Sequence, residues 1–165
     1  MTDLTTEAHE AVRLINAGRW AALATAGERG PLASMVSYAV EPEFSGLLMF
    51  LSRLARHTRN LEAGSVASLA ISVPDRPDVL DPQTLPRASV QGSIQAIERN
   101  DPGFADAWGV YASRFPTAVP RLQLGDFTLY RLVPAEARYV GGFGAARTIR
   151  GDQLRNAAND LHPRP

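Results

Sequence analysis

Apolar and polar residues alternate along much of this chain, a pattern typical of half-buried β-strands. The alternation is clearest in LASMVSYAV, residues 32–40, where every second side chain falls on the same face. Short turns flank this segment, which predicts an antiparallel meander of the first three strands. The pattern predicts strands over residues 20–25, 32–40, 47–51, 66–73, 87–98, 126–134 and 136–144.

Apolar residues spaced three and four apart indicate three helices, over residues 5–17, 54–63 and about 101–114. Thr6 is the expected cap of the first helix, and Gly92 marks a bulge or bend in its strand. We therefore predict an α+β fold, with six to seven antiparallel strands in a barrel or strongly coiled sheet and a few peripheral helices. Residues 1–150 form the single expected domain. Residues 151–165 are expected to be a polar C-terminal tail with about one helical turn.

The composition narrows the classes of partner. The chain has 165 residues, an apolar fraction of 45% and a net charge of zero, as expected for a globular domain without a nucleic-acid or membrane surface. It contains no cysteine, and its N-terminus lacks a signal-peptide pattern, so we expect a cytoplasmic protein. All 17 basic side chains are arginine, which excludes lysine-dependent chemistry such as Schiff-base formation.

One stretch, FLSRLARHTRNLEAGSVASLAI, has more polar side chains than a strand-to-helix connection needs. Arg53, Arg56 and His57 would lie on one side of the predicted helix near its N-terminus, where free N–H groups favour an anion. Ser52 and Thr58 add hydroxyl groups, and guanidinium groups bind phosphate in a bidentate manner. The residues alone leave two interpretations open, a phosphate site and a solvated basic face.

The other motifs in the sequence are weaker evidence for a functional site. The glycines of GGFG, residues 141–144, lack the Rossmann pattern and its strand–turn–helix context, and they favour close approach to a flat ligand or another chain. Arg13 stands where a zinc-protease helix needs its second histidine. The aspartates of residues 75–81 lack calcium-loop spacing. No pair of nucleophile and base is evident, which argues against hydrolysis.

The segments PLASMVSYAVEP, LLMFLSRLARHTRNLEAGSVASLAI, RASVQGSIQAIE and LYRLVPAEARYVGGFGAA occur in this order along residues 8–150. With these segments in this order, the chain resembles the pyridoxamine-phosphate-oxidase-like family of FMN-binding split barrels. It is most similar to the haem-utilisation (HugZ-like) branch, which shares the Leu-Ser-x-Leu-Ala-x-His-Thr-x-Asn run and the Gly-Gly-Phe-Gly segment.

The resemblance implies an FMN site. It places the flavin ring along a strand segment and the phosphate at the strand-to-helix connection. It also implies a homodimer with the cofactor at the interface, where each chain reaches the partner's flavin. The implied ring-facing residues are Ser34, Met35, Val36 and Ser37; those at the phosphate are Leu51, Ser52, Arg53, Arg56, His57 and Thr58; those near the partner's flavin are Arg138, Gly142 and Phe143.

The chain also departs from the family pattern. It lacks the lysine of the ring-facing strand and the C-terminal Arg-x-His of the vitamin B6 oxidases, which argues against that reaction. The leading hypothesis is an FMN-dependent oxidoreductase acting on a small-molecule redox substrate. One alternative is a haem-binding or haem-degrading protein of the same fold, with His162 as the candidate iron ligand. The other is a flavin-binding module without catalytic activity.

Overall fold

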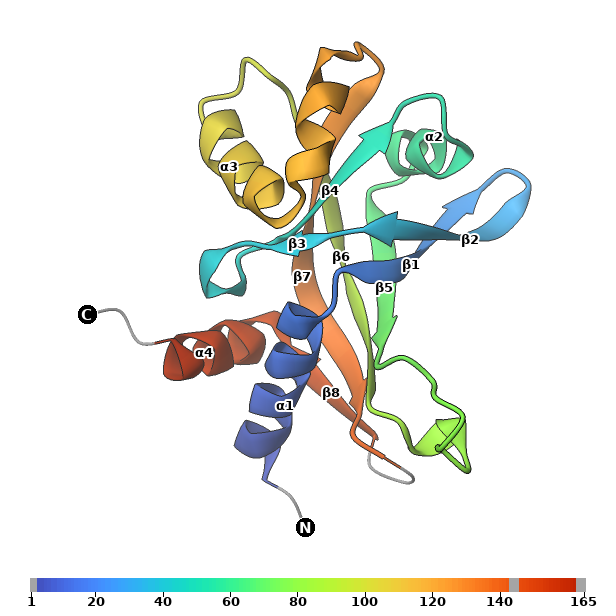
Figure 1. Ribbon diagram of the computed structural model, residues 1–165, viewed down its shortest axis with the longest axis vertical. Helices are drawn as coiled ribbons and strands as arrows, with labels where there is room; N and C mark the ends of the chain where they lie inside the picture. The colour runs from blue at the N-terminus through green and yellow to red at the C-terminus, as the bar shows by residue number, and fades with distance from the viewer. Residues whose placement is uncertain (1–2, 143–145, 163–165) are drawn as a thin grey trace.

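The computed structural model describes residues 3–142 and 146–162. Its elements alternate between strands and short helices, with one sheet at the centre (Figure 1). The strands are β1 (Trp20–Gly27), β2 (Gly30–Ser37), β3 (Ala39–Val40), β4 (Leu47–Ser52), β5 (Val66–Ser72), β6 (Arg87–Ile97), β7 (Phe127–Val140) and β8 (Ala146–Arg150). The helices are α1 (Leu4–Ala17), α2 (Arg56–Ala63), α3 (Phe104–Arg114) and α4 (Gly151–Leu161), with 3-10 turns η1 (Pro42–Phe44), η2 (Pro82–Thr84) and η3 (Pro116–Gln123).

All eight strands belong to one antiparallel sheet with the order β2-β1-β5-β6-β7-β4-β3, and β8 pairs with β7. Strands β2 and β3 lie at opposite ends of this order, yet only Tyr38 separates them in the sequence. The sheet must therefore curl until its two ends meet at Tyr38, which produces the predicted split barrel. The predicted meander is confirmed in the β1–β2 hairpin and only in part at its second turn, where β4 pairs antiparallel with the two residues of β3 but along its whole length with β7.

The predicted strands over residues 126–134 and 136–144 form one continuous strand, β7, as far as Val140. Its 14 residues pair with β6 along most of their length, with β4 at the start and with β8 at the end. The predicted bulge at Gly92 is confirmed, since the β6–β7 register shifts between Gln91 and Gly92. This long strand organises the sheet, because three other strands depend on its position.

Two apolar clusters pack on the two faces of the sheet. The larger fills the barrel and is covered at one end by α1 and α4, whose small side chains allow the helices to pack closely (Figure 1). The smaller lies under α3 and contains Phe50, Tyr111 and Leu129, with Trp108 edge-on to Phe50 at a ring separation of 4.9 Å. Both clusters are continuous hydrophobic cores that hold helices onto the sheet.

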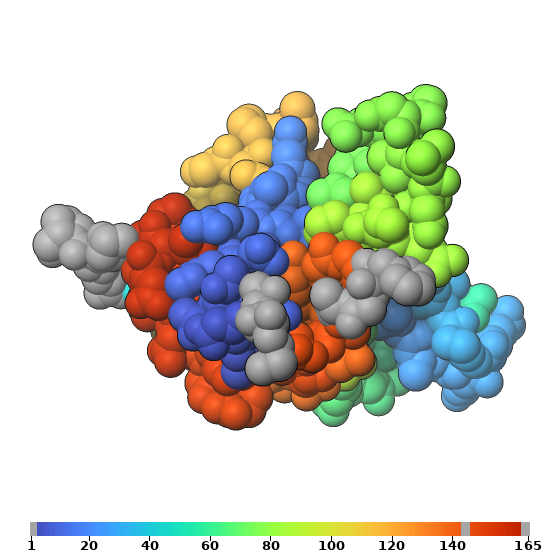
Figure 2. All heavy atoms as spheres, turned by 90° about the horizontal axis from the view of Figure 1, so that it is seen from below, coloured from blue at the N-terminus to red at the C-terminus, as the bar shows by residue number. Residues whose placement is uncertain are grey.

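The expectation of a frayed tail is wrong for residues 151–161. They form α4, and Leu154, Ala157 and Ala158 are buried against the barrel core. Seen from below (Figure 2), α1 and α4 lie next to each other, and the green loop of residues 73–86 stands out beyond α1. The sequence underestimated this helix because its exposed face is strongly polar. Among the described residues, no helix is long and apolar enough to cross a bilayer.

Two local expectations also need correction. Asp3 rather than Thr6 precedes the first helical turn, and its side chain makes no capping hydrogen bond. The second helix begins at Arg56, because residues 53–55 form a turn in which the Ala55 N–H donates to the Ser52 carbonyl. Arg53 is therefore outside this helix.

Gly92 is required for the close contact between β6 and β7. A Cβ at this position would lie 1.9 Å from the backbone carbonyl oxygen of Val133, which cannot move aside as a side chain could. We expect Gly92→Ala to lower the free energy of unfolding by about 1–3 kcal/mol through overpacking. Chemical denaturation of the purified variant measures this loss.

Gly109→Ala is the matched control. A Cβ at Gly109 has nothing within 4 Å, and the residue is inside α3, where alanine favours the helix by up to about 1 kcal/mol. If both variants were as stable as the wild-type protein or more stable, the close contact at Gly92 would not restrict the packing of β6 against β7.

Candidate functional site

A row of small side chains crosses the outer face of the sheet. Met35, Ala22, Ala70, Ser89 and Arg138 are successive partners on β2, β1, β5, β6 and β7. Neighbouring strands are about 4.8 Å apart, so the row is about 19 Å long. The three small residues in the middle leave a trough between the long side chains at its two ends.

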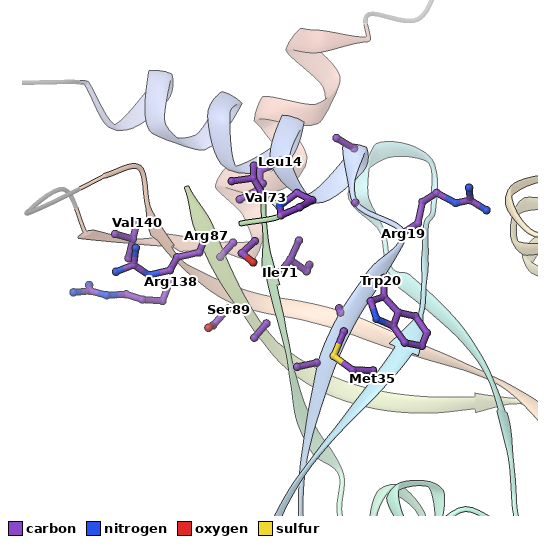
Figure 3. A pocket seen from close by; sticks show the side chains of 18 residues that line it. Leu14, Arg19, Trp20, Met35, Ile71, Val73, Arg87, Ser89, Arg138 and Val140 are labelled. Carbon is purple, nitrogen blue, oxygen red and sulfur yellow. The ribbon is translucent and has the colours of Figure 1, made fainter. Parts of the chain in front are cut away.

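The trough is the floor of a pocket of about 830 Å³, a size typical of small-molecule sites. Its lining is mostly apolar, and Figure 3 shows Trp20 and Met35 side by side at one end. Both side chains are half exposed or more, at 58% and 50%, although they are large and hydrophobic. The pocket therefore offers a long apolar surface that is open to a ligand.

Two guanidinium groups lie at the other end of the pocket, where Arg87 and Arg138 extend next to each other (Figure 3). Arg87 donates to the carbonyl oxygens of Gln83 and Leu85, and Arg138 donates to Thr148 Oγ1 at 3.2 Å. Neither forms an ion pair with a carboxylate in the part of the chain that the structure describes, in contrast to Arg53, Arg131 and Arg147. This end of the pocket is suited to an anion.

The C-terminal end of α1 forms one wall of the pocket, and two side chains hold it in place. Helix α1 has no basic residue in its last turn, and Arg114 of α3 supplies the cation there by donating to the Asn16 and Gly18 carbonyls at 3.0 and 2.9 Å. The buried hydroxyl of Tyr38 donates to the Ile15 carbonyl at 2.7 Å. The wall is therefore anchored both to α3 and to the point where the barrel closes.

The strand-to-helix connection lies elsewhere, since Ser52 and Arg53 do not line this pocket. Arg53 forms an ion pair with Glu98 at 2.7 Å, and its Nε is 3.9 Å from Glu62. Burial, and secondly Glu62, raise the pKa of Tyr130 to about 12, and its hydroxyl donates to Glu62 at 3.0 Å. Two carboxylates thus already balance the charge of Arg53.

The other residues of the predicted phosphate site differ in whether their polar groups are free to bind an anion. The Ser52 hydroxyl donates to Asp126 at 2.5 Å. Burial lowers the pKa of His57, which favours its neutral form at neutral pH. Thr58 is fully buried, and its hydroxyl has no partner among the described residues. Arg56 is exposed at the first position of α2, so it is the cation of this group best placed to bind an anion.

The predicted ring-facing residues lie on β2, but they point in different directions. Met35 lines the pocket, whereas Val36 is in the barrel core. Ser34 is half buried, and the Ser37 hydroxyl is 2.8 Å from the Tyr111 hydroxyl under α3. Leu51 is also in the barrel core.

The residues expected to reach a partner's flavin are on or just after β7. Arg138 lines the pocket, and Gly142 lies near the Thr84 carbonyl, 3.8 Å from the position of its absent Cβ. Phe143 and Gly144 are outside the described residues. Of the sequence-predicted site residues, the structure therefore brings Met35 and Arg138 together in one pocket.

Sequence reasoning missed Trp20, Arg87 and Ser89. A large aromatic residue at the start of an alanine-rich segment could have pointed to Trp20. The strands that pair with β1 and β6 could not be predicted from local patterns. No group of three or more histidine, aspartate or glutamate residues suited to a metal ion occurs among residues 3–142 and 146–162.

Comparison with known proteins identifies the family. A sequence profile described as the CREG β-barrel matches residues 2–156 of the chain. The heme oxygenase HutZ of Vibrio cholerae is 30% identical over 134 residues, which cover 80% of this chain and 74% of HutZ.

Solved structures agree with this assignment. A heme-binding protein from Mycobacterium smegmatis superposes with a TM-score of 0.81 and 26% identity, over 91% of this chain. The chain spans 60% of the length of that protein. A general stress protein 26 relative from Clostridium acetobutylicum, of the pyridoxinephosphate oxidase family, has a TM-score of 0.66 at 13% identity and covers 93% of this chain and 99% of its own; it shows the fold alone. The predicted resemblance is confirmed: the chain belongs to the CREG β-barrel family and has the pyridoxamine-phosphate-oxidase-like split-barrel fold.

Proposed function

We propose that this protein binds haem in the pocket between α1 and the outer face of the sheet. The observation that carries the proposal is the apolar trough that ends at two arginines to which no described carboxylate is paired. Haem is a flat apolar ring with two carboxylates on one edge. Such a molecule can lie on the small residues of the trough, beside Trp20, with its carboxylates at Arg87 and Arg138.

The haem alternative replaces the leading flavin hypothesis for two reasons. The similar proteins HutZ and the mycobacterial protein are named for heme, and Arg53, a central residue of the expected FMN clamp, is already paired with Glu98. An FMN site at the start of α2 stays a prediction that rests mainly on Arg56. Haem supplies redox-active iron when bound, and this chain supplies the surface that orients the ring.

We also propose that two copies associate through the outer face of β1, β2 and β5. This face consists largely of alanine and serine, with Trp20, Met35 and Val66 exposed among them. Small residues allow two sheets to approach closely, and burial of the large apolar side chains would stabilise the pair. In such a dimer the pocket would be at the interface, as the resemblance implies.

Removal of one guanidinium tests the haem site. We expect Arg138→Ala to weaken haem binding about tenfold, because one charge-assisted hydrogen bond to a carboxylate is lost. Titration followed by haem absorbance measures the change.

Arg56→Ala is the matched control, since it removes one exposed guanidinium group that lies on α2, outside the pocket. Haem affinity should be unchanged in this variant. The flavin clamp predicts a different pattern, in which FMN binds to the wild type and Arg56→Ala weakens it. Loss of haem affinity in Arg56→Ala, with none in Arg138→Ala, would place the ligand at α2.

A charge on the outer face tests the dimer. Ala24 is exposed on β1, opposite Ala33 of β2 and Ser68 of β5. We expect Ala24→Glu to convert a dimer into a monomer at micromolar concentration, because two carboxylates would be buried at the contact. Light scattering coupled to size exclusion gives the molar mass.

Ala105→Glu provides the comparison, because Ala105 is exposed on α3 away from this face. It should leave the mass of the assembly unchanged. A wild-type protein that is monomeric at the same concentration would disprove the proposed association.

A further inference from the structure

The pocket offers iron few donor atoms. Of the 18 described residues that line it, none is histidine, cysteine, tyrosine, aspartate or glutamate. Among them, the Met35 thioether is the one side-chain group of the usual axial-ligand types, and it belongs to a flexible side chain that is half exposed. A neutral thioether is a soft ligand and suits ferric iron poorly without a second donor.

All three histidines of the chain are described, and each lies away from the pocket. His9 of α1 contacts Asp160 of α4 at 3.3 Å. His57 is half buried on α2, and His162 is exposed at the end of α4. None of them is among the lining residues.

What the pocket does offer is complementary to the organic part of a porphyrin. Its floor of Ala22, Ala70 and Ser89 is flat enough for a ring, and Trp20 can contact the ring at one end. The guanidinium groups of Arg87 and Arg138 can bind ring carboxylates whether or not a metal is present.

On the basis of the proposed haem pocket, we infer that the site recognises the dicarboxylate porphyrin ring itself, so that the metal-free ring binds about as tightly as haem. The ligand class is then a planar tetrapyrrole with two free carboxylates. Iron coordination by this chain contributes little to affinity.

Trp20 gives a direct readout of the inference. The chain has two tryptophans, and Trp108→Phe leaves Trp20, inside the pocket, as the only tryptophan. Quenching of Trp20 fluorescence then reports binding of haem and of protoporphyrin IX with one probe, and competition between the two ligands shows that they share a site. The visible absorbance of each ligand, titrated with the wild-type protein, repeats the measurement without any substitution.

We expect dissociation constants for haem and protoporphyrin IX that agree within a factor of ten. The dimethyl ester of protoporphyrin IX should bind more than tenfold more weakly than the free acid, since it lacks the carboxylates. Met35→Leu, which keeps the size of the side chain and removes the sulfur, should change the affinities for haem and for protoporphyrin IX by the same factor, because any loss then comes from packing and not from an iron ligand.

The outcomes separate this inference from the proposal on which it rests. Haem binding together with protoporphyrin binding that is more than tenfold weaker overturns the inference and leaves the haem site intact; it would point to an iron ligand from a second copy. A loss of affinity in Met35→Leu that is more than tenfold larger for haem than for protoporphyrin IX also overturns it and assigns the iron ligand to the thioether. Absence of binding by either ring overturns the proposed function itself.

Discussion

The architecture depends on one covalent constraint, the single residue between β2 and β3. These strands occupy the two ends of the sheet order, so the sheet can form only if its ends meet at Tyr38. Burial of this side chain and its hydrogen bond to the Ile15 carbonyl connect the closure point to the last turn of α1. The same turn is one wall of the pocket, which means that barrel closure also determines the shape of the ligand site.

Local sequence patterns predicted most of the strands and an α+β barrel or coiled sheet, because alternation and turn residues are properties of short segments. The split barrel was predicted from the family resemblance. Local patterns could not show that β4 pairs with β7, since this contact depends on the whole chain. They also missed β8, and they assigned α4 to a tail because its apolar stripe of Leu154, Ala157, Ala158 and Leu161 is narrow and half of it is alanine. The motif around Arg53 drew attention to α2, whereas the pocket is assembled from six elements whose residues look unremarkable in isolation.

The arginine-rich motif alone did not locate an anion site, because several arginines of the chain are already held in ion pairs. Arg131 forms a bidentate ion pair with the buried Glu41 that holds the β3–β4 connection to β7, and Arg147 pairs with the buried Glu7 of α1. Arg53 likewise serves the structure through Glu98. Carboxylate partners thus mark these three arginines as structural, whereas Arg87 and Arg138 line the pocket and pair with none of the described carboxylates. The geometry, more than the count of cations, indicates where an anion can bind.

The pairing of β4 with β7 has a consequence for biosynthesis. Paired residues on these strands are separated by 75 positions for Ser52 and Phe127 and by 85 for Leu47 and Leu132. A ribosome adding about 5–20 residues per second needs about 4–17 s to cover that distance. During this time the apolar segment LLMFL has been synthesised without its main partner strand. The nascent chain thus exposes an unpaired hydrophobic strand edge for seconds, which makes it a substrate for chaperones and slows folding relative to proteins with local contacts.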